Sequence, residues 1–209
     1  MGISLKFLQE LVKVGVLKGG ERIMDIGSSN LYHADIDGVK TFVKHFTGAV
    51  DSDSAFAAEM ERGSFYDPVT GGTNGAWAGQ LFEKSGFEYT SIDIADGYKT
   101  VCFNLNEDSI PENWYNAFDV VINCGTTEHI FNQLHAFRCI HEMTKPDGIM
   151  LHQVPVSGST DHGFFIYTSR FFFELAGCND YEISEVWYDN ALSCDELLLS
   201  AHSYEKYFD

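Results

Sequence analysis

Apolar residues in the N-terminal half of the chain follow helical spacing in some stretches and form short continuous runs in others. Leucines and valines recur at helical spacing before Gly19 and Gly20, which predicts an amphipathic N-terminal helix. Residues 22–27 form an apolar run ending in an acid and a glycine, which is typical of a buried parallel strand that enters a loop. Further elements are predicted as helices at residues 37–46, 52–62 and 76–85 and as strands at residues 87–94 and 100–104.

The C-terminal half continues this alternation of strands and helices. Its predicted elements are strands at residues 118–124, 149–154, 181–188 and 196–203 and helices at residues 130–143 and 169–176. A Lys-Pro-Asp-Gly turn at 145–148 leads into the strand that follows it. The last two strands are joined by a loop too short for a helical crossover, so we expect them to form an antiparallel hairpin.

These elements predict an α/β fold, a doubly wound and mostly parallel seven-stranded sheet with a C-terminal antiparallel hairpin. We expect a single domain over residues 1–209, with an insertion at about residues 31–75, where the pattern is least regular. In such a sheet the ligand binds at the carboxyl ends of the strands, beside the first strand.

The charge of the chain restricts its partners. With 13 Lys and Arg against 31 Asp and Glu, the net charge is −18, which repels nucleic-acid phosphates and anionic lipids. No run approaches the ~20 apolar residues of a membrane span, and the N-terminus lacks a signal-peptide pattern, so we expect a cytoplasmic protein. Its five cysteines include no C-x-x-C pair, so the sequence gives no indication of a cysteine zinc site or a redox motif.

The loop after the first strand restricts the ligand. A dinucleotide-binding loop carries the pattern G-x-G-x-x-G, which lets the backbone approach a pyrophosphate. Here Gly27 is followed by Ser29 and Tyr32 at the second and third glycine positions, so we expect their side chains to disfavour NAD and FAD. A ligand with a ribose and no pyrophosphate, such as S-adenosylmethionine, needs only a tight turn, polar groups and a carboxylate for the ribose diol.

Two positions compete for that carboxylate. A nucleotide loop and its ribose acid are usually separated by ~20 residues, and the distance along the chain from Asp25 to Asp51 or Asp53 is closer to this value than the distance to Asp93. Asp93 lies farther along the chain, but it ends a full strand, whereas only two residues precede Asp51 as a strand. We therefore favour Asp93 and place the insertion before it.

Three stretches of sequence carry a family resemblance. An apolar run ending in Asp-Ile-Gly-Ser occupies residues 22–28, and a strand ending in Ile-Asp-Ile occupies residues 90–94. An aspartate-led strand at 118–124 then continues through a Glu-His pair at 128–129 and a helix to the turn at 145–148. In this order the stretches resemble the motifs of the class I S-adenosylmethionine-dependent methyltransferases.

The resemblance implies a cofactor site. Gly27 and its neighbours would hold the methionine part of S-adenosylmethionine, Asp93 the ribose, and a pair of residues after the third strand would flank the adenine. Residues after the fourth strand would line the cofactor near its sulfonium. The cofactor-binding residues expected on this basis are Asp25, Gly27, Ser28, Ser29, Asp93, Asn104, Leu105, Cys124, Gly125 and Thr126.

Methyl transfer is an in-line displacement in which alignment of the reacting atoms contributes much of the catalysis. A hydroxyl acceptor also benefits from a general base, and imidazole titrates near neutrality. The candidates are His129, His152 and His162, of which we predict His129 and His162 as catalytic residues. We interpret Glu128 as a hydrogen-bonding scaffold. No ligand motif of fixed spacing is present, so the sequence predicts no metal.

The leading hypothesis is therefore an S-adenosylmethionine-dependent methyltransferase for a small-molecule or sugar-type acceptor. Because the first motif keeps only Gly27 of its glycines, a catalytically degenerate module of the same fold remains an alternative. An NAD(P)-dependent oxidoreductase is a further, less favoured one.

Overall fold

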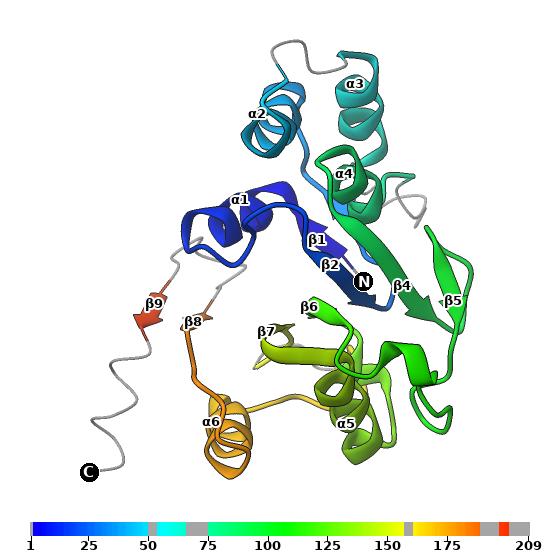
Figure 1. Ribbon diagram of the computed structural model, residues 1–209, viewed down its shortest axis with the longest axis vertical. Coiled ribbons are helices and arrows are strands. Elements are labelled where there is room, and N and C mark those ends of the chain that lie inside the picture. Colours follow the sequence, from blue (N-terminus) through cyan, green and yellow to red (C-terminus); the bar gives the residue numbers. More distant parts are fainter. Residues whose placement is uncertain (1, 50–53, 66–74, 157–160, 189–196, 201–209) are drawn as a thin grey trace. The chain divides into compact units, whose positions relative to one another are not determined.

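The computed structural model describes residues 2–49, 54–65, 75–156, 161–188 and 197–200 (Figure 1). Residue contacts divide the chain into two compact units. The first comprises Met1–Pro155 with Ser159–Ile166, and the second comprises Val156–Gly158 with Tyr167–Asp209. None of the helices in the described ranges is both long and apolar enough to span a membrane.

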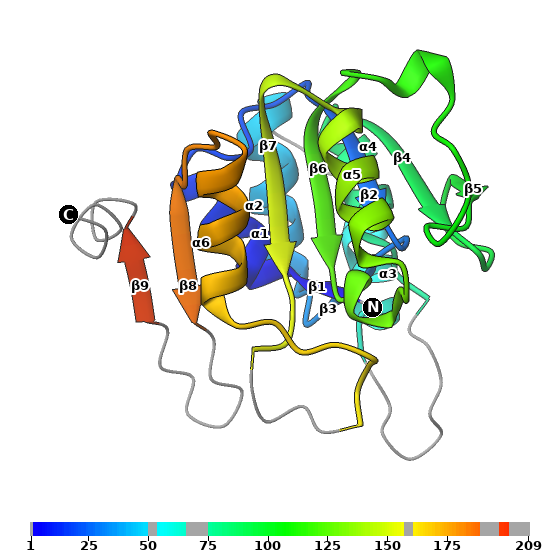
Figure 2. The same cartoon turned by 90° about the horizontal axis from the view of Figure 1, so that it is seen from below.

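The first unit contains a parallel sheet with the strand order β5-β4-β2-β6-β7. Its strands are β2 (Arg22–Ile26), β4 (Glu88–Asp93), β5 (Thr100–Cys102), β6 (Phe118–Cys124) and β7 (Thr144–Gln153). Ile26 lies opposite Ile92 on β4 and Asn123 on β6, so these strands reach the same edge together (Figure 2). The chain order reverses at β2, which makes this edge the switch point where doubly wound folds bind ligands.

Helices cover both faces of this sheet. The helical segments are α1 (Leu5–Lys13), α2 (Ile36–Thr47), α3 (Ser54–Gly63), α4 (Ala78–Lys84), α5 (Gln133–Met143) and the single 3₁₀ turns η1 (Glu112–Trp114) and η2 (Thr127–His129). In Figure 1, α4 and α5 lie on opposite sides of the sheet. Apolar side chains on strands and helices form the buried core between them, including Leu8, Ile23 and Ile140, each with no exposed surface.

A small parallel sheet joins β1 (Gly2–Ser4) to β3 (Asn30–Tyr32), and the sequence pattern did not predict either strand. Gly2 is required there because a Cβ atom at its position would lie 1.7 Å from the ring of Tyr32. Beside β3, the Leu31 amide donates to the Ala76 carbonyl at 2.8 Å. Residues on either side of the segment 32–75 are therefore neighbours, and α4 follows as the crossover helix between β2 and β4.

The predicted turn at 145–148 proved to be part of a strand. β7 begins at Thr144, which pairs with Phe118, and the pairing shifts register before Val120 meets Ile149. Asp147 adopts a left-handed conformation at φ +62° within this irregularity. Residues 145–148 thus form a bulge inside β7, whereas the sequence pattern predicted a turn that precedes the strand.

The second unit holds α6 (Ser169–Cys178), β8 (Glu185–Tyr188) and β9 (Leu197–Ser200). β8 and β9 pair antiparallel in a two-stranded sheet of their own. The described residues therefore confirm an α/β fold with a mostly parallel sheet, but they do not confirm seven strands in one sheet ending in a hairpin. The single domain likewise stays a prediction.

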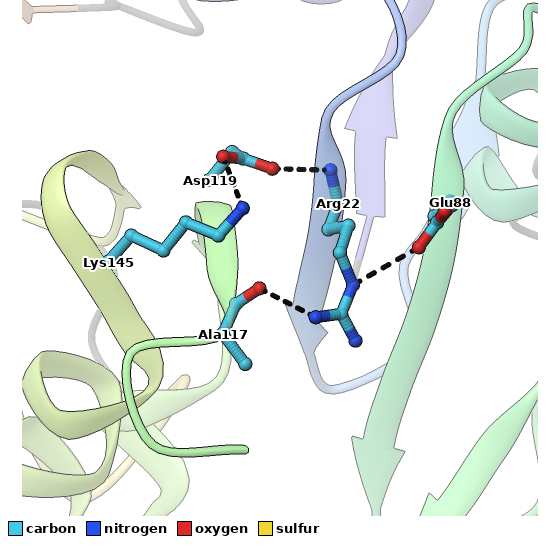
Figure 3. Close-up of polar contacts among 5 residues, drawn as sticks. All are labelled: Arg22, Glu88, Ala117, Asp119 and Lys145. Carbon is cyan, nitrogen blue, oxygen red and sulfur yellow. Dashed lines mark hydrogen bonds and ion pairs between the residues drawn. The ribbon is translucent and has the colours of Figure 1, made fainter. Parts of the chain in front are cut away.

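Hydrogen bonds and ion pairs of charged residues connect the strands of the large sheet near their amino-terminal ends (Figure 3). Asp119 accepts hydrogen bonds from the Arg22 amide at 2.9 Å and from Lys145 Nζ at 2.7 Å. The Arg22 guanidinium donates to the Ala117 carbonyl at 3.0 Å and pairs with Glu88 at 3.1 Å. Desolvation raises the pKa of Asp119, but its bonds to Lys145 and Arg22 outweigh this and lower the pKa. This network connects β2, β4, β6 and β7 at the edge opposite the switch point.

Candidate functional site

A buried carboxylate shapes the loop after β2. Asp25 is 1% exposed and accepts hydrogen bonds from the Ser29 amide at 2.7 Å, the Ser29 hydroxyl at 3.0 Å and the Tyr89 hydroxyl at 2.7 Å. Between Asp25 and its partner Ser29, Gly27 and Ser28 both have positive φ angles, +107° and +43°. Glycine tolerates this conformation freely, whereas serine adopts it here because its neighbour is fixed to Asp25.

The environment of Asp25 opposes its ionisation. Desolvation by burial raises the pKa of this carboxyl, and the charge of Asp93 adds to the effect, while the bonds from Ser29 and Tyr89 oppose it. Burial and the nearby Asp25 also raise the pKa of Tyr89 well above its usual value, so the phenol stays a hydrogen-bond donor. Tyr89 was not identified from the sequence, where it reads as an apolar strand residue.

The loop after β4 packs directly on the loop after β2. The Ser28 hydroxyl accepts a hydrogen bond from the Tyr98 amide at 3.1 Å. A Cβ atom on Gly97 would lie 2.3 Å from the Ser28 oxygen, so glycine is required for this close approach. The two loops therefore form one continuous surface at the carboxyl edge of the sheet.

Asp93 ends β4 next to Gly27, whose amide donates to the Ile92 carbonyl at 2.7 Å. The Asp93 side chain is half-buried, and its Oδ1 atom accepts from the Ala95 amide at 3.0 Å. Within the described residues its other carboxylate oxygen accepts no hydrogen bond. The adjacent Ile94 is 75% exposed, an unusual position for a large apolar side chain. Asp51 and Asp53, the competing candidates, lie outside the described residues.

The two residues expected near an adenine follow β5. Leu105 is buried, and Asn104 is half-buried with its amide group donating to Glu107 Oε1 at 2.8 Å. One residue farther on, the Asn106 side-chain oxygen accepts from the amides of Phe131 and Asn132, both at 3.0 Å. Asn106, which sequence reasoning missed, therefore connects the loop after β5 to the segment after β6.

Cys124, Gly125 and Thr126 leave the carboxyl end of β6. The Thr126 hydroxyl donates to the Ile26 carbonyl, which fixes this turn to the end of β2. Gly125 has a φ of +76°, and its amide donates to the Gln153 carbonyl at 2.9 Å. Burial raises the pKa of the Cys124 thiol well above its usual value, so this thiol is neutral and unreactive. The predicted residues of three loops thus meet at one edge.

The two histidines predicted to be catalytic lie together. His129 in η2 and His162 in the segment 161–166 have ring centroids 5.1 Å apart, and both side chains are exposed. His162 Nε2 lies 3.5 Å from Oε1 of Glu128, whose side chain is 1% exposed. Neither Glu128 carboxylate oxygen accepts a hydrogen bond from the described residues, so the hydrogen bonds that Glu128 makes here come from its backbone.

The backbone of Glu128 brings the two histidine segments together. Its carbonyl oxygen accepts hydrogen bonds from the amides of Phe164 at 2.8 Å and Phe165 at 3.1 Å. A Cβ atom on Gly163 would lie 2.8 Å from the same oxygen, so only glycine allows this approach without a shift. The aromatic rings of Phe131 and Phe164 meet edge to face beside the histidines, and both are mostly exposed.

His152, the third histidine candidate, is in a different environment. Its Nδ1 atom lies 3.1 Å from the side-chain nitrogen of Asn123, which makes Nδ1 the acceptor. Burial lowers the pKa of His152 to about 4, so the ring is neutral at pH 7. Asn123 Nδ2 also donates to the Thr127 hydroxyl at 2.9 Å. His152 therefore supports the turn before Glu128.

The low pKa of His152 predicts a specific acid sensitivity. An unfolded histidine titrates near 6.5, so the neutral, half-buried ring contributes stability above pH 6.5 that is lost progressively as the pH falls from 6.5 to about 4. Between pH 7 and pH 5 this amounts to about 2 kcal/mol. Urea unfolding at both pH values should show that His152→Asn loses less stability on acidification than the wild type. Equal losses in the two proteins would contradict the assignment.

One argument from the sequence needs correction. The Ser29 hydroxyl points to Asp25, and Tyr32 lies in β3 with its ring over Gly2, so these side chains do not act as the expected block to a pyrophosphate. The observation that disfavours a dinucleotide is different. After β2 the chain enters β3, and the next helix begins only at Ile36, so no helix follows the loop directly to face a pyrophosphate.

Comparison with known proteins gave one family match. A family model described as a methyltransferase domain matches residues 70–187, more than half of the 209-residue chain. The match includes Asp93, the turn after β6 and both exposed histidines, and it begins after the loop that follows β2. No curated protein and no solved structure matches the chain.

Proposed function

Because the chain belongs to the methyltransferase domain family, one of the class I S-adenosylmethionine-dependent families, we propose that it methylates a small-molecule or sugar-type acceptor. The observation that supports this proposal is the meeting of three loops at the switch point of the sheet. They bring Gly27 to Ser29, Asp93, and Gly125 with Thr126 to one edge. We infer that this edge is the cofactor site.

The residues at this edge fit S-adenosylmethionine in polarity and position. A carboxylate with one oxygen open to a ligand, as in Asp93, suits the two hydroxyls of a ribose. We assign Leu105, Asn104 and the exposed Ile94 to the adenine, which needs an apolar surface and a polar edge. The loop Gly27 to Ser29, shaped by Asp25, would hold the methionine part. When bound, the cofactor supplies a methyl group on a cationic sulfonium.

The acceptor side of the proposed site begins where the turn after β6 continues into η2. We assign His129 and His162 to this side because both side chains are exposed. His129 lies in η2, which follows Thr126, and His162 lies beside the Glu128 carboxylate. In their neutral form either imidazole can take the proton of a hydroxyl acceptor. The exposed rings of Phe131 and Phe164 favour an acceptor with an apolar part.

The charge of the protein further restricts the proposed acceptor. A net charge of −18 opposes the approach of polyanions, which disfavours nucleic acids and anionic membranes as partners. A neutral or cationic small molecule meets no such barrier. The reduced glycine pattern around Gly27 supports a second candidate, a degenerate module that binds the cofactor or a related nucleotide without turnover.

Calorimetric titration tests the proposal directly. We expect the purified protein to bind S-adenosylmethionine and S-adenosylhomocysteine with micromolar affinity and to show no heat with NADH. Binding of both adenosyl ligands followed by methyl transfer in an acceptor screen would support the enzyme. Binding without product across neutral and cationic acceptors would favour the degenerate module, and absence of binding to both adenosyl ligands would contradict the proposed function.

A further inference from the structure

The Glu128 side chain is a buried carboxyl group that accepts no hydrogen bond from the described residues. Only 1% of it is exposed, and both carboxylate oxygens lack hydrogen bonds from the described residues. Burying an ionised carboxylate is costly unless hydrogen bonds or an opposite charge compensate it. The nearest candidate is His162 Nε2, at 3.5 Å from Oε1. This position therefore calls for a cation that the protein side chains only partly provide.

Two imidazoles approach the same carboxylate. One ligand atom each from Glu128, His129 and His162 lies within 4.8 Å of the others. A divalent metal ion with bonds of about 2.0–2.2 Å to nitrogen and oxygen holds adjacent ligand atoms about 3–3.5 Å apart. Both histidine side chains are exposed, so their rings have room to turn toward this spacing. Glu128, being buried, provides the fixed ligand.

The backbone maintains this arrangement independently of the side chains. Two amide hydrogen bonds from the segment 161–166 to the Glu128 carbonyl, together with the close approach of Gly163, hold His162 next to the carboxylate. The histidines lie 33 positions apart in sequence, 162 − 129, which is why no ligand motif of fixed spacing was recognisable.

We propose that Glu128, His129 and His162 bind a divalent transition-metal ion. Two imidazoles and one carboxylate suit manganese, iron, cobalt or zinc better than magnesium or calcium, which prefer oxygen ligands. Three protein ligands leave coordination positions open, and the exposed histidines place these on the solvent side, where an acceptor can enter.

Metal binding has a consequence for the reaction, which rests on the proposed methyltransferase function. When bound, the ion would lower the pKa of an acceptor hydroxyl beside it and so favour loss of the hydroxyl proton to water. His129 and His162 then act as ligands and not as general bases. Binding of the ion itself does not depend on this role.

The test uses the full chain, freed of metal with a chelator and titrated with Co²⁺ and Mn²⁺ in the absence of adenosyl ligands. We expect one equivalent to bind, with a Co²⁺ absorption spectrum that lacks a thiolate band and a raised unfolding temperature. His162→Asn and Glu128→Gln should each weaken binding at least about tenfold, since even indirect partners of metal ligands contribute that much. His45→Asn, which removes an exposed histidine of α2, should bind as the wild type does.

The outcomes separate the metal site from the proposed function. His162 is 53% exposed, so His162→Asn should fold even where Glu128→Gln does not, which circular dichroism in chelator will show. Absence of binding by the wild type, or equal binding by His162→Asn and His45→Asn, overturns the site and leaves the histidines as candidate bases. Metal binding without binding of the adenosyl ligands supports the metal site and contradicts the proposed methyltransferase function. Binding of the adenosyl ligands without metal binding supports that function and contradicts the metal site.

Discussion

Replacing Asp25 with alanine should destabilise the protein by about 3 kcal/mol and abolish measurable binding of S-adenosylmethionine. The substitution leaves the buried Ser29 amide and Tyr89 hydroxyl without an acceptor, at about 1–3 kcal/mol each, while relief of the buried charge offsets part of the cost. Without its anchor, Ser28 no longer holds a positive φ angle, and the loop loses the shape assigned to the methionine part. Urea unfolding at pH 7 and calorimetric titration measure the two effects.

Two matched variants serve as controls for the Asp25 prediction. Tyr89→Phe removes one of the three donors and should cost about 1 kcal/mol. In Asp25→Asn the charge is gone. Because burial raises the pKa of Asp25, the wild type loses stability as the pH rises from 3.8 through that higher value, and Asp25→Asn should lack this loss. If Asp25→Ala is no less stable than Tyr89→Phe, the carboxylate does not organise the loop.

Asp93→Ala should weaken binding of S-adenosylmethionine by about 10–100-fold without a comparable loss of stability. Two hydrogen bonds to a ribose contribute on the order of 1–3 kcal/mol to binding. Among the residues that the structure describes, Asp93 accepts only the Ala95 amide, in an exposed turn, so its removal should disturb little of the fold. Titration calorimetry gives the affinity, and thermal unfolding shows whether the variant is intact.

The competing position supplies the comparison for Asp93. Asp51→Ala and Asp53→Ala should bind the cofactor as the wild type does. If either weakens binding while Asp93→Ala does not, the ribose carboxylate lies in the segment before α3 and our interpretation of the insertion is wrong. Similar losses in all three would point to a general effect of charge.

Much of the fold was determined by local sequence patterns. Apolar runs bounded by acids and glycines predicted β2, β4 and β6, and helical spacing placed α1, α2 and α5 to within a few residues. These signals are strong because burial on both faces of a parallel sheet demands continuous apolar strands. The family resemblance was also readable from the sequence, since it rests on residues that follow one another along the chain.

Other features arise only from tertiary contacts. β1 and β3 are three-residue strands that exist because they pair with each other, and the residues 145–148 extend β7 because β6 lies beside them. The hydrogen-bond partners of Asp25 include Tyr89, which is 64 positions away, 89 − 25, and lies in a different strand. Local propensity carries no information on such partners.

The sequence by itself thus determined most of the helices, the main strands of the large sheet and the family resemblance, because periodicity and motif are properties of neighbouring residues. The tertiary structure alone decided that Ser29 turns inward to Asp25, that His152 contacts Asn123, and that the buried Glu128 side chain lies close to His129 and His162. Burial and charge compensation depend on what the fold brings into contact, and the chain order does not specify this.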